Sequence, residues 1–196
     1  MPIFVPDQYA NYKIFGIDPG LSNAGVSIYT LDGYTGQILN IEALTLINDR
    51  LKDPCEVDFE SHSERTYKLL RLKQAFIELL NYHRPACVSC EAPFYNRLRP
   101  MAYGALVEVV SYIYSAVLEY NGNIRFETFP PMTVKKFIGA KAIKNNTVKG
   151  KIEVSDAVSN NPEIMSVLTV PLADLSEHAI DAVAVGYTSC RMPKEI

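Results

Sequence analysis

The sequence of 196 residues has little that would place the chain outside the cell or in a membrane. Its four cysteines are too few and too scattered for the disulfide framework of a secreted module, which favours a reducing compartment. The first twelve residues lack the basic start and the apolar core of a signal peptide, and no uninterrupted apolar run approaches membrane-spanning length. We therefore expect a cytoplasmic, intracellular protein that does not bind membranes.

The sequence also lacks a boundary for a second domain. Its length suits one domain of ordinary size, and 48% apolar with 21% charged residues is the balance of a globular protein. We therefore treat residues 1–196 as a single domain, with residues 1–12 as an N-terminal extension.

Positive charge is scarce overall. The formal net charge is -3, whereas proteins that coat DNA owe much of their affinity to an excess of lysine and arginine. The lysines are concentrated, however, because residues 135–151 contain six of them and no acid. A solvated loop is the simpler interpretation of such a run. The candidate DNA contacts in it are Lys135, Lys136, Lys141, Lys144, Lys149 and Lys151.

Two short motifs lack the context that would make them functional. Cys87 and Cys90 form a Cys-x-x-Cys pair inside a strand-like apolar run without a second ligand pair, so we interpret them as core thiols. Gly16, Gly20 and Gly25 suggest a phosphate-binding loop, but such a loop needs a helix directly after the glycines. Here the following residues alternate as in a strand.

The segment 13–29, KIFGIDPGLSNAGVSIY, predicts two strands joined by a turn at Pro19 and Gly20. Asp18 stands at the end of the first strand. An ionised side chain that ends a buried strand is costly unless it is compensated, and a bound cation is the usual compensation. The simpler alternative is that Asp18 only forms the turn, since Asp before Pro-Gly is common in turns.

The rest of the chain alternates between strand and helix patterns. A third strand at 37–47 would complete an antiparallel meander. Further elements are expected as follows: a helix from a Ser61/Glu64 capping box to about Tyr82, a strand at 86–91, a helix at 100–120, a strand at 124–129, a short helix from Pro130–Pro131, a helix at 148–158, and a helix with Asp174 as N-cap that runs to about Cys190. The helix at 100–120 is expected to bury more than one face, either in the core or against a partner subunit.

Three separate elements offer metal-binding side chains. Glu91 ends a second apolar strand, as Asp18 does, while His178 and Asp181 are three residues apart on the last helix and share a face. A surface histidine is the simpler interpretation of His178, and we interpret Glu177 as a partner of the helix dipole. The four-ligand set suits Mg²⁺ or Mn²⁺. Two such ions roughly 4 Å apart can support phosphodiester hydrolysis.

The loop after Glu91 has the composition of a nucleic-acid contact. It contains Phe94, Tyr95, Arg97 and Arg99, whose aromatic and guanidinium groups can stack on bases and hold phosphates. The alternative is that both aromatic side chains pack beneath the loop.

Three segments, GIDPGLSNAG, CEAPF and HAIDAVAVGYTSC, resemble in this order the signature segments of the RuvC family of Holliday junction resolvases. The resemblance extends from about Lys13 to Cys190. It implies an α/β, RNase H-like fold, in which helices flank a five-stranded mixed sheet whose first three strands are antiparallel. It also implies a homodimer that binds four-way DNA junctions in recombination and repair and makes paired symmetric nicks, which leave 5'-phosphate and 3'-hydroxyl ends.

The resemblance also implies roles for individual residues. Asp18 would bridge two Mg²⁺ ions, Glu91 would hold one of them, and His178 with Asp181 would hold the other. Mn²⁺ is expected to substitute, because imidazole suits it better than it suits Mg²⁺. Phe94 would stack on bases near the crossover, Lys149 would lie near the scissile phosphate, and Lys135 or Lys136 would be a second DNA contact. A branch-migration helicase works with some family members, but no segment here identifies its docking site.

Other functions are open at this point. The chain could be a RuvC-like nuclease that cuts flaps or forks, or a non-catalytic module that binds junctions with structural acids. An actin-like ATPase fragment is suggested only by the DPG turn, and this chain is too short for the two domains of that fold.

Overall fold

A computed structural model describes residues 11–53, 63–95, 97, 100–140 and 154–192. Within these residues one five-stranded sheet has the order β3-β2-β1-β4-β5. β1 pairs antiparallel with β2, as β2 does with β3, whereas β4 is parallel to both β1 and β5. The strands are β1 (Asn11–Asp18), β2 (Asn23–Asp32), β3 (Ile38–Ile47), β4 (Cys87–Glu91) and β5 (Arg125–Phe129). The predicted mixed sheet, with its first three strands antiparallel, is confirmed.

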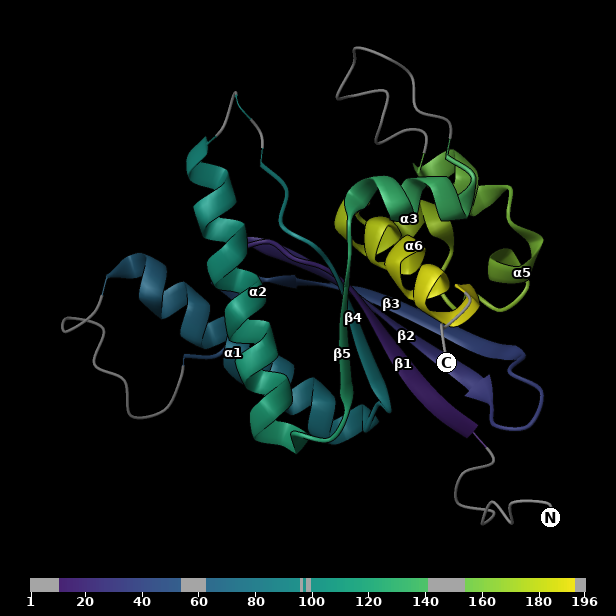
Figure 1. The fold of residues 1–196 in the computed structure, drawn as a ribbon, viewed down its shortest axis with the longest axis horizontal. Helices are drawn as coiled ribbons and strands as arrows, with labels where there is room; N and C mark the ends of the chain where they lie inside the picture. Colours follow the sequence, from purple (N-terminus) through teal and green to yellow (C-terminus); the bar gives the residue numbers. More distant parts are fainter. Residues whose placement is uncertain (1–10, 54–62, 96, 98–99, 141–153, 193–196) are drawn as a thin grey trace.

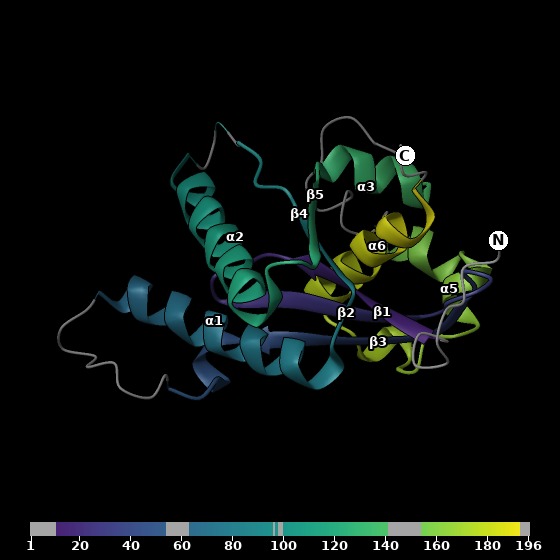
Figure 2. The same cartoon turned by 60° about the horizontal axis from the view of Figure 1, so that its bottom comes forward.

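Helices cover both faces of the sheet (Figure 1). One face carries α1 (Glu64–His83) and α2 (Pro100–Asn121), and the other carries α3 (Pro131–Ile138), α5 (Pro162–Met165) and α6 (Glu177–Arg191), as the turned view in Figure 2 shows. Alternation along β1 explains this arrangement. Phe15 and Ile17 belong to the core under α1 and α2, while Ile14 belongs to the core under α6.

Two predicted helix starts are wrong by a few residues. α1 begins after Ser63, whose hydroxyl accepts from the Thr66 N–H at 3.2 Å, whereas Ser61 lies outside the described residues. α6 begins after Ser176 and not after Asp174, which lies in a short 3-10 turn. In both cases a serine nearer the helix has the extended backbone of an N-cap and a hydroxyl within reach of the third N–H.

The helix predicted at 148–158 is helical from 154 to 159, and residues 148–153 lie outside the described residues. The predicted core thiols Cys87 and Cys90 are buried in β4.

The sequence contains no uninterrupted apolar run of membrane-spanning length, but α2 is a long helix with few charged residues. By length and composition alone it could cross a membrane, and only 22% of its most apolar stretch is buried. It nevertheless packs along α1, because Val109 and Ile113 enter the core beneath it and Glu108 forms an ion pair with Arg65. Its outer side leaves Leu118 49% exposed. Burial of more than one face in the core is therefore wrong for this helix, and burial of its outer side against a partner subunit stays a prediction.

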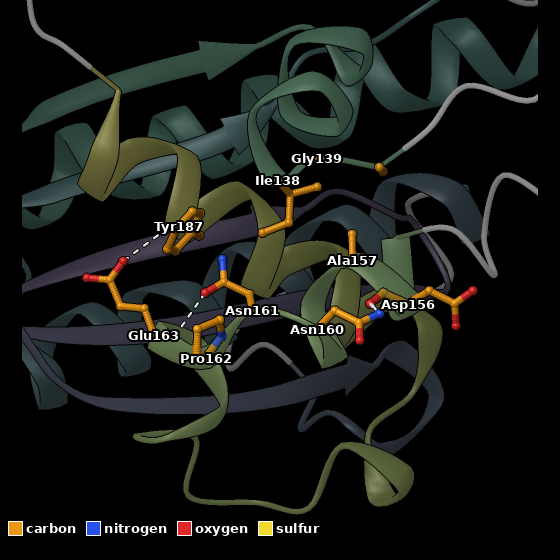
Figure 3. Close-up of a pocket in the computed structure, with 10 residues that line it drawn as sticks. Ile138, Gly139, Asp156, Ala157, Asn160, Asn161, Pro162, Glu163 and Tyr187 are labelled. Atoms are coloured by element: carbon orange, nitrogen blue, oxygen red, sulfur yellow. Dashed lines mark hydrogen bonds between the residues drawn. The ribbon is translucent and has the colours of Figure 1, made fainter.

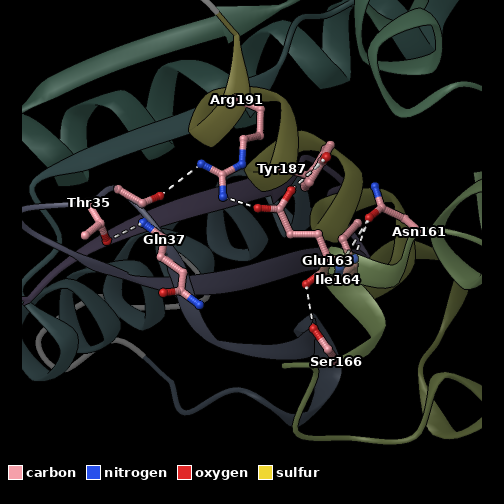
Figure 4. Close-up of polar contacts among 9 residues, drawn as sticks. Thr35, Gln37, Asn161, Glu163, Ile164, Ser166, Tyr187 and Arg191 are labelled. Atoms are coloured by element: carbon pink, nitrogen blue, oxygen red, sulfur yellow. Dashed lines mark hydrogen bonds and ion pairs between the residues drawn. The ribbon is translucent and has the colours of Figure 1, made fainter.

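The residues after α5 and the end of α6 contact β3 and the β2–β3 hairpin, at one edge of the sheet. Residues beyond α5 cover part of β3, because Ile41 donates to the Val167 carbonyl and Thr169 donates back to Ile41, at 2.9 and 3.0 Å. At the end of α6, Arg191 pairs with Glu163 of α5 and donates to the Gly36 carbonyl at 2.9 Å (Figure 4). The ion pair lowers the pKa of Glu163. These contacts attach α5 and α6 to the β2–β3 hairpin, and none was predicted.

Candidate active site

Asp18 and Glu91 lie next to each other at one end of the sheet. β1 and β4 are parallel and pair in a register that sets Ile17 opposite Cys90, so the next residues along are Asp18 and Glu91. Both side chains point to the face that carries α6, because side chains alternate along a strand and Ser89, two residues before Glu91, meets α6 directly. Its hydroxyl donates to Ser189 at 2.7 Å.

α6 lies unusually close to the sheet. A Cβ placed on Gly16 would overlap the backbone of Gly186, so the two glycines allow strand and helix to touch through their main chains. Ser27 of β2 adds a polar contact, because its buried hydroxyl donates to the Ala182 carbonyl at 2.7 Å. The small residues of α6 allow this close approach: Ala179, Ala182, Ala184 and Gly186.

The first turn of α6 is held against the mouth of the β1–β2 hairpin. Gly25 pairs directly with Asp18, and a Cβ at Gly25 would overlap the backbone carbonyl oxygen of His178. The hydroxyl of Ser176, the N-cap, lies 2.5 Å from that of Thr45 on β3. As a result the imidazole of His178 reaches Asp18, with 2.7 Å between Nδ1 and Oδ2. His178 is therefore not an isolated surface histidine.

Glu91 is a largely buried carboxyl group whose pKa is shifted by the other acids of the site. Burial, and then the negative charges of Asp18 and Asp181, raise its pKa from 4.5 to about 8, while Lys135 acts in the opposite direction. Crowded carboxylates with little solvent are the condition under which a bound cation is most favourable. The structure thus brings the acids of three predicted elements, Asp18, Glu91 and Asp181, into one electrostatic cluster, with Lys135 of α3 beside it.

The donor set fits a hard divalent cation, because it consists of carboxylates and one imidazole. The side chains do not form a closed cage: among the described residues, no three His, Cys, Asp or Glu side chains are already arranged around one point that could hold a metal ion. The His178 contact supplies a physical reason, since it already occupies one oxygen of Asp18. A cation that binds this oxygen of Asp18 would have to replace the imidazole of His178 there.

The candidate DNA contacts are only partly described. Phe94 and Tyr95 are 49% and 63% exposed, so the alternative in which they pack beneath the loop is wrong. The Tyr95 ring meets Tyr103 of α2 edge to face, with ring centroids 5.8 Å apart. Arg97 is exposed as well, and Lys136 is exposed on α3. The remaining candidates, Arg99, Lys141, Lys144, Lys149 and Lys151, lie outside the described residues.

No protein-family profile matches this chain, and no curated protein matches it by sequence. Solved structures do match. Thermus thermophilus RuvC in complex with a Holliday junction substrate has a TM-score of 0.60 at 19% identity, over 90% of this chain and 91% of that one. The yeast mitochondrial Holliday junction resolvase has a TM-score of 0.61 at 14% identity, over 93% of this chain and 79% of that one. This chain has a RuvC-like resolvase fold.

The RuvC-like fold agrees with the order of the three signature segments in the sequence. A second structure of Thermus thermophilus RuvC matches at 23% identity with the same TM-score of 0.60, over 90% of this chain and 92% of that one. At these identities the match concerns the fold, so the chemistry has to be argued from the side chains described above.

A cavity also exists away from the acids. It has a volume of about 780 Å³ and is lined by the end of α3, by Asn160 and Asn161, and by Tyr187 of α6 (Figure 3). None of the predicted site residues lines it. The acid cluster lies at the surface end of the sheet instead.

Sequence reasoning missed several residues that shape the site. Gly25 could have been found, because a glycine inside a strand often marks the close approach of another backbone. Ser176 and Thr45 carry no local signal, since their contact joins residues far apart in the chain. The same is true of Asn48, at the end of β3, which binds the turn after Asp18.

Proposed function

We propose that the chain is a metal-dependent, structure-selective endonuclease that resolves four-way DNA junctions by paired symmetric nicks. The observation that carries this proposal is the cluster of Asp18, Glu91 and Asp181 with His178, at one end of the sheet of a RuvC-like fold. Three acids that crowd one another are costly for a protein without a charged ligand. Hydrolysis of a phosphodiester by metal-bound water uses such a set.

The side chains support a division of labour around two divalent cations, with Mg²⁺ expected and Mn²⁺ able to substitute. Asp18 is the neighbour of Glu91 in the strand pairing and contacts His178, so it would contribute to both ions. Glu91 would hold one, and His178 with Asp181 would hold the other. When bound, the ions would activate a water molecule and stabilise the leaving oxygen, which gives 5'-phosphate and 3'-hydroxyl ends. Lys135, beside Glu91, would attract the phosphate group.

The surface around the acids supports a DNA substrate. Phe94 follows Glu91 by three residues and is exposed beside Tyr95, so both rings can stack on unpaired bases at a crossover. Lys149 and the neighbouring lysines 141, 144 and 151 would contact the phosphate backbone. In Thermus thermophilus RuvC the solved complex contains a Holliday junction, and we propose the same class of substrate here.

Symmetric nicks require two active sites, and the outer side of α2 supports a homodimer. Tyr114 and Leu118 are 44% and 49% exposed on this helix, and Val107 is 37% exposed. An exposed apolar stripe on a helix that otherwise packs in the core is typical of a subunit contact. We propose that α2 of one subunit packs on α2 of its partner.

The deciding experiment compares a labelled synthetic four-way junction with a linear duplex of the same sequence, each in Mg²⁺, Mn²⁺ or EDTA. We expect symmetric, ligatable nicks in the junction alone, which need metal and disappear in Asp18→Asn. Asp49→Asn, an exposed acid at the end of β3, is the matched control and should cut normally. A junction that is bound and never cut would refute the nuclease. Equal cutting of flaps and forks would favour the relaxed branched-DNA nuclease instead.

A further inference from the structure

Asn48 is a fully buried polar residue, 0% exposed, at the start of the turn after β3. Its backbone N–H donates to the carbonyl of Ser22 at 2.8 Å. Its side-chain Nδ2 donates to the carbonyl of Leu21 at 3.0 Å and to that of Lys68 in α1 at 2.8 Å. One residue therefore joins the β1–β2 connection to the first half of α1.

This connection directly follows the residue on which the proposed chemistry depends. Residues 19–22 are the whole link between Asp18, the last residue of β1, and Asn23, the first residue of β2. Pro19 fixes its own φ and restricts the backbone of Asp18 before it, so the start of the link has few conformations. Asn48 binds the carbonyls of the last two linking residues, Ser22 through its backbone N–H and Leu21 through its side chain, and only the bond to Leu21 depends on the asparagine side chain.

The energetics of Asn48 indicate that core stability alone does not account for it. Its Oδ1 is buried and accepts no hydrogen bond from any residue that the structure describes. A buried acceptor without a donor lowers stability, whereas leucine, which is branched at the same carbon but larger, would bury no polar side-chain atom. The two bonds from Nδ2 are what asparagine supplies and leucine does not.

We propose that Asn48 is a positioning residue for the metal site: by fixing residues 19–22, it holds the Asp18 carboxylate where it can share a divalent cation with Glu91 and Asp181. The inference rests on the proposed function for that cation. It concerns Asn48, in the turn after β3, and its contact with Lys68, and it makes α1 part of the framework that places Asp18.

The test uses Asn48→Leu, with Asn81→Leu as its matched control. Asn81 also donates a side-chain N–H to a backbone carbonyl, that of Ile77 at 2.9 Å, but it does so on the exposed side of α1. Three quantities are measured on the full chain: the thermal midpoint in EDTA, the affinity for Mn²⁺ without DNA by calorimetry well below that midpoint, and the rate of junction cleavage.

We expect Asn48→Leu to weaken Mn²⁺ binding and to slow cleavage, each by about 10- to 100-fold, which is the usual effect of removing support behind a metal ligand. Added Mn²⁺ should recover part of the cleavage, and Asn81→Leu should match the original chain in both. A purely structural role would lower only the thermal midpoint. Unchanged Mn²⁺ affinity in Asn48→Leu overturns the proposal, whatever happens to the midpoint.

If Asn48→Leu does not fold, Asn48→Ala, which introduces no bulk, is measured in the same way and judged by the same criterion. The outcomes also separate this inference from the proposed function. An original chain that binds Mn²⁺ and cuts no junction refutes only the nuclease, because the Mn²⁺ titration still decides the role of Asn48. An original chain that does not bind Mn²⁺ at all refutes both.

Discussion

Glu91→Gln should stabilise the metal-free protein at neutral pH while it abolishes cleavage. The pKa of Glu91 is raised from 4.5 to about 8 by burial and by Asp18 and Asp181. Between these two values the unfolded chain has released a proton that the folded chain retains. The free energy of unfolding therefore falls as the pH rises through this interval, and the stabilising contribution of the protonated group is lost above about pH 8. Glutamine has the shape of the protonated acid and does not titrate.

The size of the effect follows from the shift. One pKa unit corresponds to about 1.4 kcal/mol, so the variant should gain about 1.4 kcal/mol over the original chain for each pH unit between about 5 and 8. The full difference, reached near pH 8, is on the order of 4 kcal/mol, because the carboxyl is mostly buried and little screened.

The assay is urea denaturation in EDTA at several pH values across this interval, with Glu78→Gln as the control. Glu78 is an exposed acid on α1, so its replacement makes the same change in formal charge away from the cluster. Excess Mg²⁺ should flatten the pH dependence of the original chain, because the cation takes the place of the proton. If the free energy of unfolding changes with pH in the same way for the original chain and Glu91→Gln in EDTA, the pKa of Glu91 is not raised by burial and the neighbouring acids.

Further variants test other parts of the account. Phe94→Ala should slow cleavage far more than it weakens junction binding, and equal losses in both assays would remove its role at the crossover. Lys149→Ala should flatten the slope of log K against log salt by about one unit, and an unchanged slope would assign this lysine to solvent. Leu118→Arg should convert a dimer to a monomer in sedimentation, and a chain that sediments identically would exclude α2 as the interface. Gly25→Ala should lower the free energy of unfolding by about 1–3 kcal/mol through overpacking against α6, and an unchanged urea midpoint would contradict that contact.

The strands and the acids at their ends were predictable because both are local signals. Alternating apolar residues mark β1, β2 and β3, and a carboxylate at the end of a buried strand is conspicuous in Asp18 and Glu91. The pairing of β1 with β4 then brings these two carboxylates together, because parallel neighbours place equivalent ends side by side. The spacing of His178 and Asp181 was equally local, because residues three apart share a helix face.

The burial of the acids and the contacts that hold the site in place were not predictable, because both depend on residues that are distant in the sequence. The sequence pattern of Asp174 and Glu177 resembles a capping box, yet Ser176 is the cap since its hydroxyl reaches the Ala179 N–H. The raised pKa of Glu91 depends first on its burial and then on how closely Asp18 and Asp181 approach, which only the folded chain determines. Likewise, nothing near Asn48 in the sequence indicates that it binds residues 21 and 68.

The glycine contacts beneath α6 have a consequence for how this protein can diverge. At Gly16 and Gly25 the distance between helix and sheet is set by backbone meeting backbone, and a Cβ at Gly186 would overlap the side chains of Tyr29 and Ser27. In the proposed function the acids serve the chemistry, and amides of the same shape would fill their places. A descendant that lost cleavage and kept another use for the fold would therefore lose Asp18 and Glu91 long before it lost the glycines. Among distant relatives, the glycines would mark shared architecture, and the acids would mark which members still cut.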